Sequence, residues 1–383
     1  MSTVGAMRVA LSAEEREQRS HFRAFVAEFV APYASEWDRR AEVPSAAVES
    51  LRAAGFLGAP AAREHGGGGF EPIVYGLLTE EIGRGCSSLR SLLTVHDMVT
   101  LAVLRWGSRE LKEEIAPRLS RGERLGALAL SEPGVGSDAG AVLTRAEPRG
   151  DGWVLSGQKK WTTFGQIAVE FLVLARAPEG LVALLVNAES AGFERRPLQG
   201  VVGTRASRLA ELFFDGCFVP RERQLGRVGF GLSHVFATAL DHGRYSVAWG
   251  AVGISQACLD ACLAYTSARV QGGSILLEHD LVRRHLTDML ARTEAARLLC
   301  CRAGTLRAEK DPAAVSATMI AKYFASRAAV ESANSAVHLH GANGLSEDFP
   351  VERYLRDAKV TEIIEGSSEI QQLAIPRYPL SEL

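Results

Sequence analysis

One short segment near the C-terminus carries residue types that together could do acid–base chemistry. In Ile364-Glu365-Gly366-Ser367-Ser368, a single carboxylate stands directly before a glycine and two serines. The neighbouring isoleucines give Glu365 apolar surroundings, which raise the pKa of a carboxyl and make it a stronger base. The glycine lets a ligand approach the backbone, and serine hydroxyls can hydrogen-bond a cofactor. A loop between two helices would look the same, so the segment needs support from elsewhere.

A second segment, more than 200 residues upstream, supplies that support. The run Leu130-Ser131-Glu132-Pro133-Gly134-Val135-Gly136-Ser137-Asp138, taken with Glu365-Gly366-Ser367, resembles the paired signatures of the acyl-CoA dehydrogenase family in residues, order and spacing. The resemblance extends from about residue 10 to about residue 375. It implies an FAD-dependent dehydrogenase of acyl thioesters. Glu365 would be the base, its backbone N–H would help to hold the thioester carbonyl, and flavin N5 would accept the hydride.

Length and composition agree with such an enzyme without identifying it. The 383 residues suffice for two or three domains. A net charge of −2 gives no electrostatic case for nucleic-acid binding. We expect neither a secretory signal nor a membrane span, because no apolar run approaches roughly 18–20 residues. Six scattered cysteines are typical of buried free thiols in a reducing cytoplasm, which predicts a cytoplasmic protein.

The patterning predicts an α+β protein in three parts. Residues 1–120 are expected to be helical, starting with a capping box of Ser12 and Glu15 and interrupted by a connector at glycines 66–69. Residues 121–230 hold short apolar runs typical of an antiparallel barrel or sandwich. Residues 231–383 return to helices, with candidates at 233–268, 281–309 and 312–338. The resemblance implies the same order: an N-terminal helical domain, a central antiparallel β domain and a C-terminal four-helix bundle.

The FAD is inferred from the resemblance, because no Gly-x-Gly-x-x-Gly motif stands between a strand and a helix. In the family, the flavin lies between the β domain and the C-terminal bundle. The positions that match its contacts there are Leu128, Leu130, Ser131, Gly136, Ser137, Trp161, Thr163, Ser367 and Glu369. Trp161 would pack against the side of the flavin. Without the resemblance, a strand aromatic in the core would be an equally good interpretation.

A second group of flavin contacts would come from a neighbouring subunit, which implies a homodimer or homotetramer. The matching positions, at the diphosphate and over the adenosine end, are Arg269, Gln271, His338, Gly341 and Ala342. The chain departs from the family at Gly272, which replaces a phenylalanine, at His338, which replaces a glutamine, and at Ala342, which replaces a glycine. His338 and His340 are two residues apart, but no third ligand is in view, so we expect no metal site.

Two further segments bear on the substrate. Residues 86–95, with Arg90 and Ser91, and residues 244–250, with Trp249, look like the glutaryl-CoA dehydrogenase branch, in which the arginine–serine pair meets a substrate carboxylate. A guanidinium suits bidentate carboxylate binding. Trp249 would fill the acyl cavity and favour a short substrate. The alternatives are a surface arginine near a helix start and a tryptophan that only packs helices together.

Gly83 stands where that branch has a glutamate, which argues against glutaryl-CoA itself. The whole combination looks closest to acyl-carrier-protein-linked dehydrogenases that make hydroxymalonyl- or aminomalonyl-type extender units for polyketide antibiotics. These act on a three-carbon acyl group with a polar α substituent, and the oxidised carbon could be an aldehyde or its hydrate. Asp241 and Arg244 match positions near the pantetheine entrance, which CoA and carrier-protein substrates share.

Three hypotheses follow from the sequence. The first is an acyl-carrier-protein-linked dehydrogenase of extender-unit biosynthesis. The second is a short-chain or glutaryl-type acyl-CoA dehydrogenase of catabolism. The third is a flavin-binding scaffold without turnover, which the intact Glu365 disfavours. The expected electron acceptor is an electron-transferring flavoprotein, with oxygen as an alternative.

Overall fold

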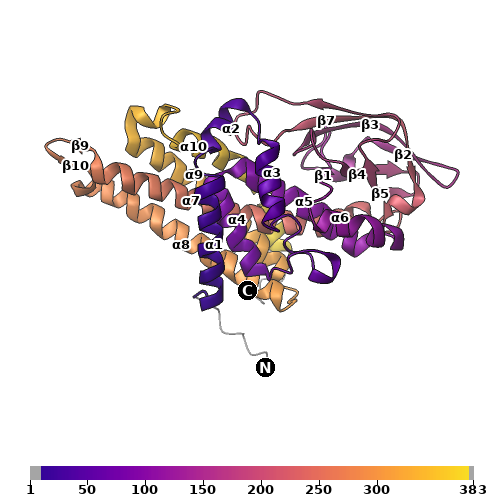
Figure 1. Ribbon diagram of the computed structural model, residues 1–383, viewed down its shortest axis with the longest axis horizontal. Helices are drawn as coiled ribbons and strands as arrows, with labels where there is room; N and C mark the ends of the chain where they lie inside the picture. Colours follow the sequence, from indigo (N-terminus) through magenta and orange to yellow (C-terminus); the bar gives the residue numbers. More distant parts are fainter. Residues whose placement is uncertain (1–9, 379–383) are drawn as a thin grey trace.

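Helices form the first and last parts of the chain, and strands form the middle (Figure 1). The computed structural model describes residues 10–378. In Figure 1 the strands gather at the right, the long C-terminal helices extend to the left, and the N-terminal helices lie between them. This arrangement confirms the expected α+β fold.

The N-terminal part positions two helices that later bear on the site, α4 and α5. Its helices are α1 (Ala13–Phe29), α2 (Ala34–Arg40), α3 (Ser45–Ala53), α4 (Pro72–Gly85), α5 (Ser87–Trp106) and α6 (Ala116–Ser120). The predicted capping box is confirmed: the Ser12 hydroxyl accepts from the Glu15 N–H at 3.1 Å, and the Glu15 carboxylate accepts from the Ser12 N–H at 2.7 Å. A short 3-10 turn, Arg63–His65, precedes the glycine run, which is a connector and follows no strand.

The middle part is one mixed sheet. Its strands are β1 (Gly126–Ala129), β2 (Arg145–Arg149), β3 (Gly152–Thr162), β4 (Glu170–Ala177), β5 (Gly180–Asn187), β6 (Phe193–Pro197), β7 (Ala210–Pro220) and β8 (Gln224–Leu225). They follow the order β6-β7-β3-β2-β4-β5-β8, and β1 also pairs with β4. Most pairs are antiparallel as expected, but β1 and β2 run parallel to β4. Parallel pairing needs a long crossover, which the chain between β1 and β4 supplies.

The C-terminal part is a bundle built around one buried helix. Its helices are α7 (Ala237–Ala268), α8 (Asp280–Ala308), α9 (Ala314–His340), α10 (Val351–Ile363) and α11 (Ser368–Ala374), with a small hairpin of β9 (Val270–Gln271) and β10 (Ser274–Ile275) after α7. Helix α7 contacts α4, α5, α8, α9 and α10. It therefore links the N-terminal helices to the rest of the bundle.

Helix α7 also corrects one expectation from the sequence. Together with the π-helical turn Gly231–Phe236 it is long and apolar enough, by composition, to cross a bilayer, with a mean hydropathy of 1.4 in its most apolar stretch. Asp241 and Arg244 interrupt the segment, so it does not stand out as one apolar run. In the structure 72% of that stretch is buried inside the protein, which accounts for its composition.

Helices α4 and α7 approach each other so closely that glycines are required at their contact. A Cβ added at Gly253 would lie 2.2 Å from the Glu80 carbonyl oxygen. A Cβ added at Gly83 would lie 3.0 Å from the Cα atom of Gly250. A side chain at position 83 would press against the α7 backbone, so Gly83 fits the close packing of the two helices.

This contact predicts an unequal response to alanine. Gly253→Ala should lower the free energy of unfolding by about 1–3 kcal/mol, because the methyl group overlaps a backbone carbonyl. Gly83→Ala should cost much less, since a gain in helix propensity of roughly 1 kcal/mol offsets a milder contact. Urea unfolding of both variants beside the wild type measures the difference. Equal stabilities would mean that α4 and α7 are further apart than described.

Candidate active site

The predicted base lies in a tight turn between α10 and α11. Glu365 has a φ angle of 56° and Gly366 a φ angle of 90°, so two consecutive residues have left-handed backbone. A glutamate in this conformation is uncommon and persists only where surrounding contacts hold it. Such contacts are present here. Arg244 Nε of α7 donates to the Glu365 carbonyl at 3.1 Å, and Lys322 Nζ of α9 donates to the Gly366 carbonyl at 2.7 Å.

The Glu365 carboxylate is buried against α7 and α5. A Cβ added at Gly243 would lie 2.6 Å from Glu365 Oε2 and 2.8 Å from Met98 Sδ, so the carboxylate occupies the space that a side chain at 243 would fill. Glu365 Oε2 has no hydrogen-bond partner among the described residues. Burial raises the pKa of Glu365 to about 7, against the opposing positive charges of three basic side chains, Arg244, Lys322 and Arg90. A carboxyl so placed can serve as a base near neutral pH.

Helices α5 and α7 face each other along the stretch that separates Glu365 from Arg90. Met98 is opposite Gly243, and the hydroxyls of Thr94 and Ser246 are 2.7 Å apart. A Cβ added at Gly250 would lie 2.8 Å from Arg90 Nε. The helices are therefore antiparallel here, and Arg90, Thr94 and Met98 share one face of α5. Arg90 and Met98 are about 12 Å apart along the helix axis.

Arg90 is a buried cation without a counter-ion. Its side chain donates to Thr94 Oγ1 at 3.0 Å and to Ser91 Oγ at 3.2 Å, while its Nε has no partner among the described residues. The residue is 1% exposed and forms no ion pair with any residue between 10 and 378. Burial lowers its pKa to about 10, so it stays charged at neutral pH. The alternative of a surface arginine does not fit this position.

The other predicted substrate residues contact other elements of the protein. The indole of Trp249 is fully buried over Gly76 of α4, where an added Cβ would lie 2.2 Å from the ring. This is the helix-packing alternative, and a role in shaping the acyl cavity stays a prediction. Asp241 pairs with Arg307 at 2.7 Å. Arg244 holds the base's own carbonyl oxygen, a role that sequence reasoning did not assign to it.

The predicted flavin contacts from the β part share one edge of the sheet. Leu128 is on β1, and the loop after it contains Leu130, Ser131, Gly136 and Ser137. Trp161 is at the end of β3, and Thr163 is in the turn that follows. The Lys160 N–H donates to the Ser131 carbonyl at 2.8 Å, which joins the two segments. Leu128 and Leu130 pack in the same cluster as Met98, so this edge adjoins the base.

Trp161 has the properties of a ligand-facing residue. It is 52% exposed and has a φ angle of 66°, so the alternative of a core aromatic is wrong. A large exposed aromatic held in left-handed backbone beside Ser131 and Thr163 suits the side of an isoalloxazine ring. Together with the unpartnered Glu365 Oε2, these properties of Trp161 indicate that the residues present fit the FAD that the motifs imply.

Sequence reasoning missed the ion pair that shapes this loop. The buried Glu132 carboxylate accepts from the Leu143 N–H at 2.6 Å, the Thr144 N–H at 2.9 Å and Lys159 Nζ at 2.8 Å. Lys159 Nζ also donates to the Leu130 carbonyl at 3.0 Å. The sequence did contain a signal of this ion pair. Lys159 stands at an inward-facing position of β3, where the alternation of side chains along the strand predicts an apolar residue.

The second group of predicted flavin contacts is far from Glu365. Arg269 follows the end of α7, 25 residues after Arg244, which is about 37 Å along the helix axis. It precedes the β9–β10 hairpin at the far left of Figure 1. The 3-10 turn Gly341–Leu345, which contains Ala342, joins this end of the bundle because Asn343 Nδ2 donates to Tyr265 of α7 at 3.0 Å. These residues and Glu365 of the same chain cannot contact one short ligand.

The two histidines of this region have other contacts. The His340 ring stacks on Tyr265 with centroids 4.2 Å apart, and the His338 ring lies 5.5 Å from His285. Within residues 10–378, no group of three or more His, Cys, Asp and Glu side chains is placed to hold a metal ion.

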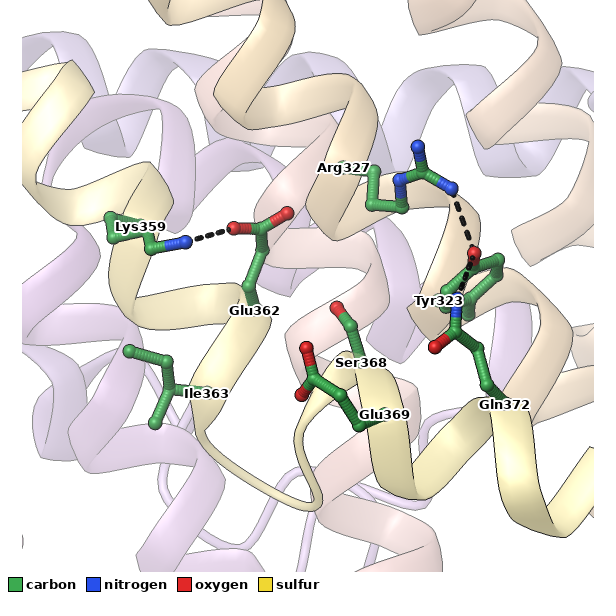
Figure 2. A pocket seen from close by; sticks show the side chains of 8 residues that line it. All are labelled: Tyr323, Arg327, Lys359, Glu362, Ile363, Ser368, Glu369 and Gln372. Carbon is green, nitrogen blue, oxygen red and sulfur yellow. Dashed lines mark hydrogen bonds and ion pairs between the residues drawn. The ribbon is translucent and has the colours of Figure 1, made fainter.

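A pocket of about 250 Å³ lies behind the base's turn, between α9, α10 and α11 (Figure 2). Figure 2 shows Glu369 and Ser368 of α11 facing the side chain of Glu362 on α10, with Tyr323 of α9 across the pocket. Glu369, a predicted cofactor contact, thus faces this pocket. Ser367 caps the N-terminus of α11, where its hydroxyl accepts from the Ile370 N–H at 3.4 Å.

Comparison with known proteins covers nearly the whole chain. Residues 12–123, 127–217 and 231–378 match the N-terminal, middle and C-terminal domains of acyl-CoA dehydrogenases. The probable acyl-CoA dehydrogenase FadE25 of Mycobacterium tuberculosis is 37% identical over 374 residues, which are 96% of this chain and 95% of that protein. The human mitochondrial short-chain specific acyl-CoA dehydrogenase is 37% identical over 364 residues, 94% of this chain and 88% of that protein.

Solved structures agree with this assignment. A glutaryl-CoA dehydrogenase in complex with glutaryl-CoA is similar with a TM-score of 0.92 and 33% identity, covering 97% of this chain and 96% of that one. FkbI, described as acting in biosynthesis of the methoxymalonyl extender unit of the polyketide FK520, is similar with a TM-score of 0.86 and 33% identity, covering 95% and 99%. With all three domains matched and a buried glutamate next to the edge that fits a flavin, this chain belongs to the acyl-CoA dehydrogenase family, whose members are FAD-dependent oxidoreductases of acyl thioesters.

Proposed function

We propose that this enzyme dehydrogenates a short acyl thioester whose acyl group ends in a carboxylate or another strongly polar group, carried on an acyl carrier protein for polyketide extender-unit biosynthesis. The observation that supports it best is the buried Arg90, which has no counter-ion within residues 10–378 and lies two helical turns from the base's neighbour Met98. A buried charge without a partner is costly to a fold. A substrate carboxylate would offset that cost.

The excess of positive charge around Glu365 supports an acyl group with strongly polar oxygen atoms. Arg90, Arg244 and Lys322 all act on the pKa of Glu365, and none of the three forms an ion pair with a described residue. When Glu365 is ionised, one carboxylate faces three cations. Hydroxyl or carboxylate oxygens on the acyl group would accept hydrogen bonds from these cations, whereas an apolar chain would leave the cations without a partner on the substrate.

The chain's own residues divide the reaction between them. Glu365 takes the α proton, which burial of its carboxylate favours. The Glu365 backbone N–H makes no hydrogen bond to another described residue, so it is free to hold the thioester carbonyl and stabilise the charge that develops there. FAD, held by the sheet edge at Ser131, Trp161 and Thr163, would supply the hydride acceptor.

The distance between Glu365 and the second group of predicted flavin contacts supports a second subunit at each flavin. Arg269 and Gln271 lie too far from Glu365 to serve its flavin, whereas the same residues of a neighbouring subunit can do so. We therefore propose at least a homodimer, located in the cytoplasm and passing electrons to an electron-transferring flavoprotein. Asp241 and Arg244 would lie near the thioester's pantetheine arm.

The size of the acyl group is the second element of the proposal. Gly83 supplies no side chain that could contact a glutaryl group. Its close contact with Gly250 also disfavours any side chain at position 83. The similarity to FkbI, which acts in extender-unit biosynthesis, supports a three-carbon acyl group on a carrier protein. A catabolic short-chain acyl-CoA dehydrogenase is the second candidate, favoured by 37% identity to the human short-chain enzyme.

The test is anaerobic bleaching of the flavin absorbance by a matched panel. The panel is butyryl-CoA, glutaryl-CoA, and a three-carbon hydroxyacyl or aminoacyl group on a carrier protein. We expect bleaching with the carrier-linked acyl group at least about tenfold faster than with either CoA ester, a difference of roughly 1.4 kcal/mol. Fastest bleaching with butyryl-CoA would overturn the proposal in favour of the catabolic candidate.

Removing the base should separate cofactor binding from turnover. Glu365→Gln should keep its flavin and its unfolding temperature but lose on the order of 10²–10⁴-fold in the rate of flavin reduction, because an amide cannot take the proton. Glu113→Gln, whose exposed side chain pairs with Arg109 at the surface, is the control and should reduce at the wild-type rate. Normal reduction in the Glu365 variant would remove it from the mechanism.

Replacing Arg90 should discriminate among substrates. In Arg90→Lys the fork geometry is lost, so carboxyl-bearing thioesters should lose about 10–100-fold in kcat/KM, as expected for a hydrogen bond to a charged group. Butyryl-CoA should lose much less. Arg105→Lys, on the exposed face of the same helix, controls for the substitution itself. Equal losses for charged and neutral substrates would make Arg90 a purely structural residue.

A further inference from the structure

Lys322 is a second buried cation without an ion pair, and it contacts the backbone of the base's turn. Its Nζ donates to the Gly366 carbonyl at 2.7 Å from α9, across 44 residues of sequence. The residue is fully buried, and no carboxylate of residues 10–378 pairs with it. A neutral donor would make the same hydrogen bond at a lower cost of burial, so the charge calls for an explanation of its own.

The charged groups around the turn come from every helix that packs on it. Glu365 is affected by Arg244 of α7, Lys322 of α9 and Arg90 of α5. Burial lowers the pKa of Lys322 to about 8, and the charge of Glu365 acts to raise it. Besides Glu365, the groups acting on Lys322 are Arg244, Glu362 and Glu369. Each of the two buried side chains, Lys322 and Glu365, therefore favours the charged form of the other.

The backbone geometry gives Lys322 a second effect. The Glu365 carbonyl is held by Arg244, and the Gly366 carbonyl by Lys322, while Gln371 Nε2 lies 3.4 Å and 3.3 Å from the two oxygens. With both carbonyls bonded to cations, the left-handed turn is fixed from two helices. The Glu365 N–H and carboxylate then remain available to the substrate.

We propose that Lys322 is a positioning residue for the base: its ammonium holds the Gly366 carbonyl and keeps Glu365 ionised at the working pH. The inference rests on the proposed function only in taking Glu365 as the proton acceptor. It applies to any acyl group that the enzyme accepts.

Three substitutions separate the charge from the hydrogen bond. Lys322→Met removes both, Lys322→Gln keeps a donor without the charge, and Lys322→Arg keeps the charge and a donor. Ser326→Ala, one turn further along α9 and equally buried, removes a side chain that bonds only within its own helix and is the matched control. The measurement is the rate of anaerobic flavin reduction from pH 5.5 to 9, using the thioester that reduces the wild type fastest.

For the wild type we expect the rate to rise with pH through about 7, since Glu365 must lose its proton to act. In Lys322→Gln and Lys322→Met this rise should move about one pH unit or more upward, because a nearby positive charge has been removed. Because about half of Glu365 is ionised at pH 7 in the wild type and roughly a tenth after a shift of one unit, the rate at pH 7 should fall about fivefold or more while KM changes less than threefold. Lys322→Arg should restore the wild-type profile, and Ser326→Ala should keep it.

Two results would overturn the inference. One is an unchanged pH profile in both Lys322→Gln and Lys322→Met at normal flavin content. The other is an equal loss in all four variants without a shift, which would make α9 packing the cause. Glu365→Gln tells the two proposals apart: if that variant reduces normally, the assignment of the base has failed, and the Lys322 profile then reports on another group.

Discussion

Burying an ionisable carboxylate disfavours its charged form, and the arrangement of helices around Glu365 follows from how this protein meets that constraint. The cost of taking a carboxylate out of water is several kcal/mol. Here it is offset by cations from three different helices, Arg244 on α7, Lys322 on α9 and Arg90 on α5. The carboxylate is therefore neither fully stabilised nor neutral. Its pKa near 7 is the balance between burial and these charges.

Helix α7 does most of the positioning. It has no side chain at Gly243, where the carboxylate lies, and it supplies Arg244 to the base's carbonyl and Ser246 to the Thr94 hydroxyl. Its glycines also let α4 and α5 come close. Further along, the same helix leads to Arg269 at the opposite end of the bundle. One buried helix thus contacts the predicted base, the arginine proposed to bind the acyl group and the residues proposed to reach a second subunit's flavin.

The charge pattern connects the fold to the choice of substrate. Several buried ions among residues 10–378 are paired, as in Glu132 with Lys159 and Glu80 with Arg297, and these pairs join separate elements of the fold. Arg90 and Lys322 differ because their partners are hydroxyls and carbonyls. Unpaired buried cations near one carboxylate are a poor way to stabilise a fold. Their positions suit a site that receives a strongly polar acyl group and keeps the proposed base ionised.

The amino-acid sequence by itself determined the family and the helix–strand–helix order, and it predicted Glu365 as the base, because short-range periodicity and motif spacing are local properties. It also singled out Arg90 and the residues at the sheet edge. Tertiary structure alone decided that Arg90 is buried without a counter-ion, that Trp161 is exposed, that Arg269 is far from Glu365 and that Lys322 reaches Gly366. Burial and charge pairing depend on which helices meet. Those contacts join residues tens to hundreds of positions apart, where sequence spacing carries no signal.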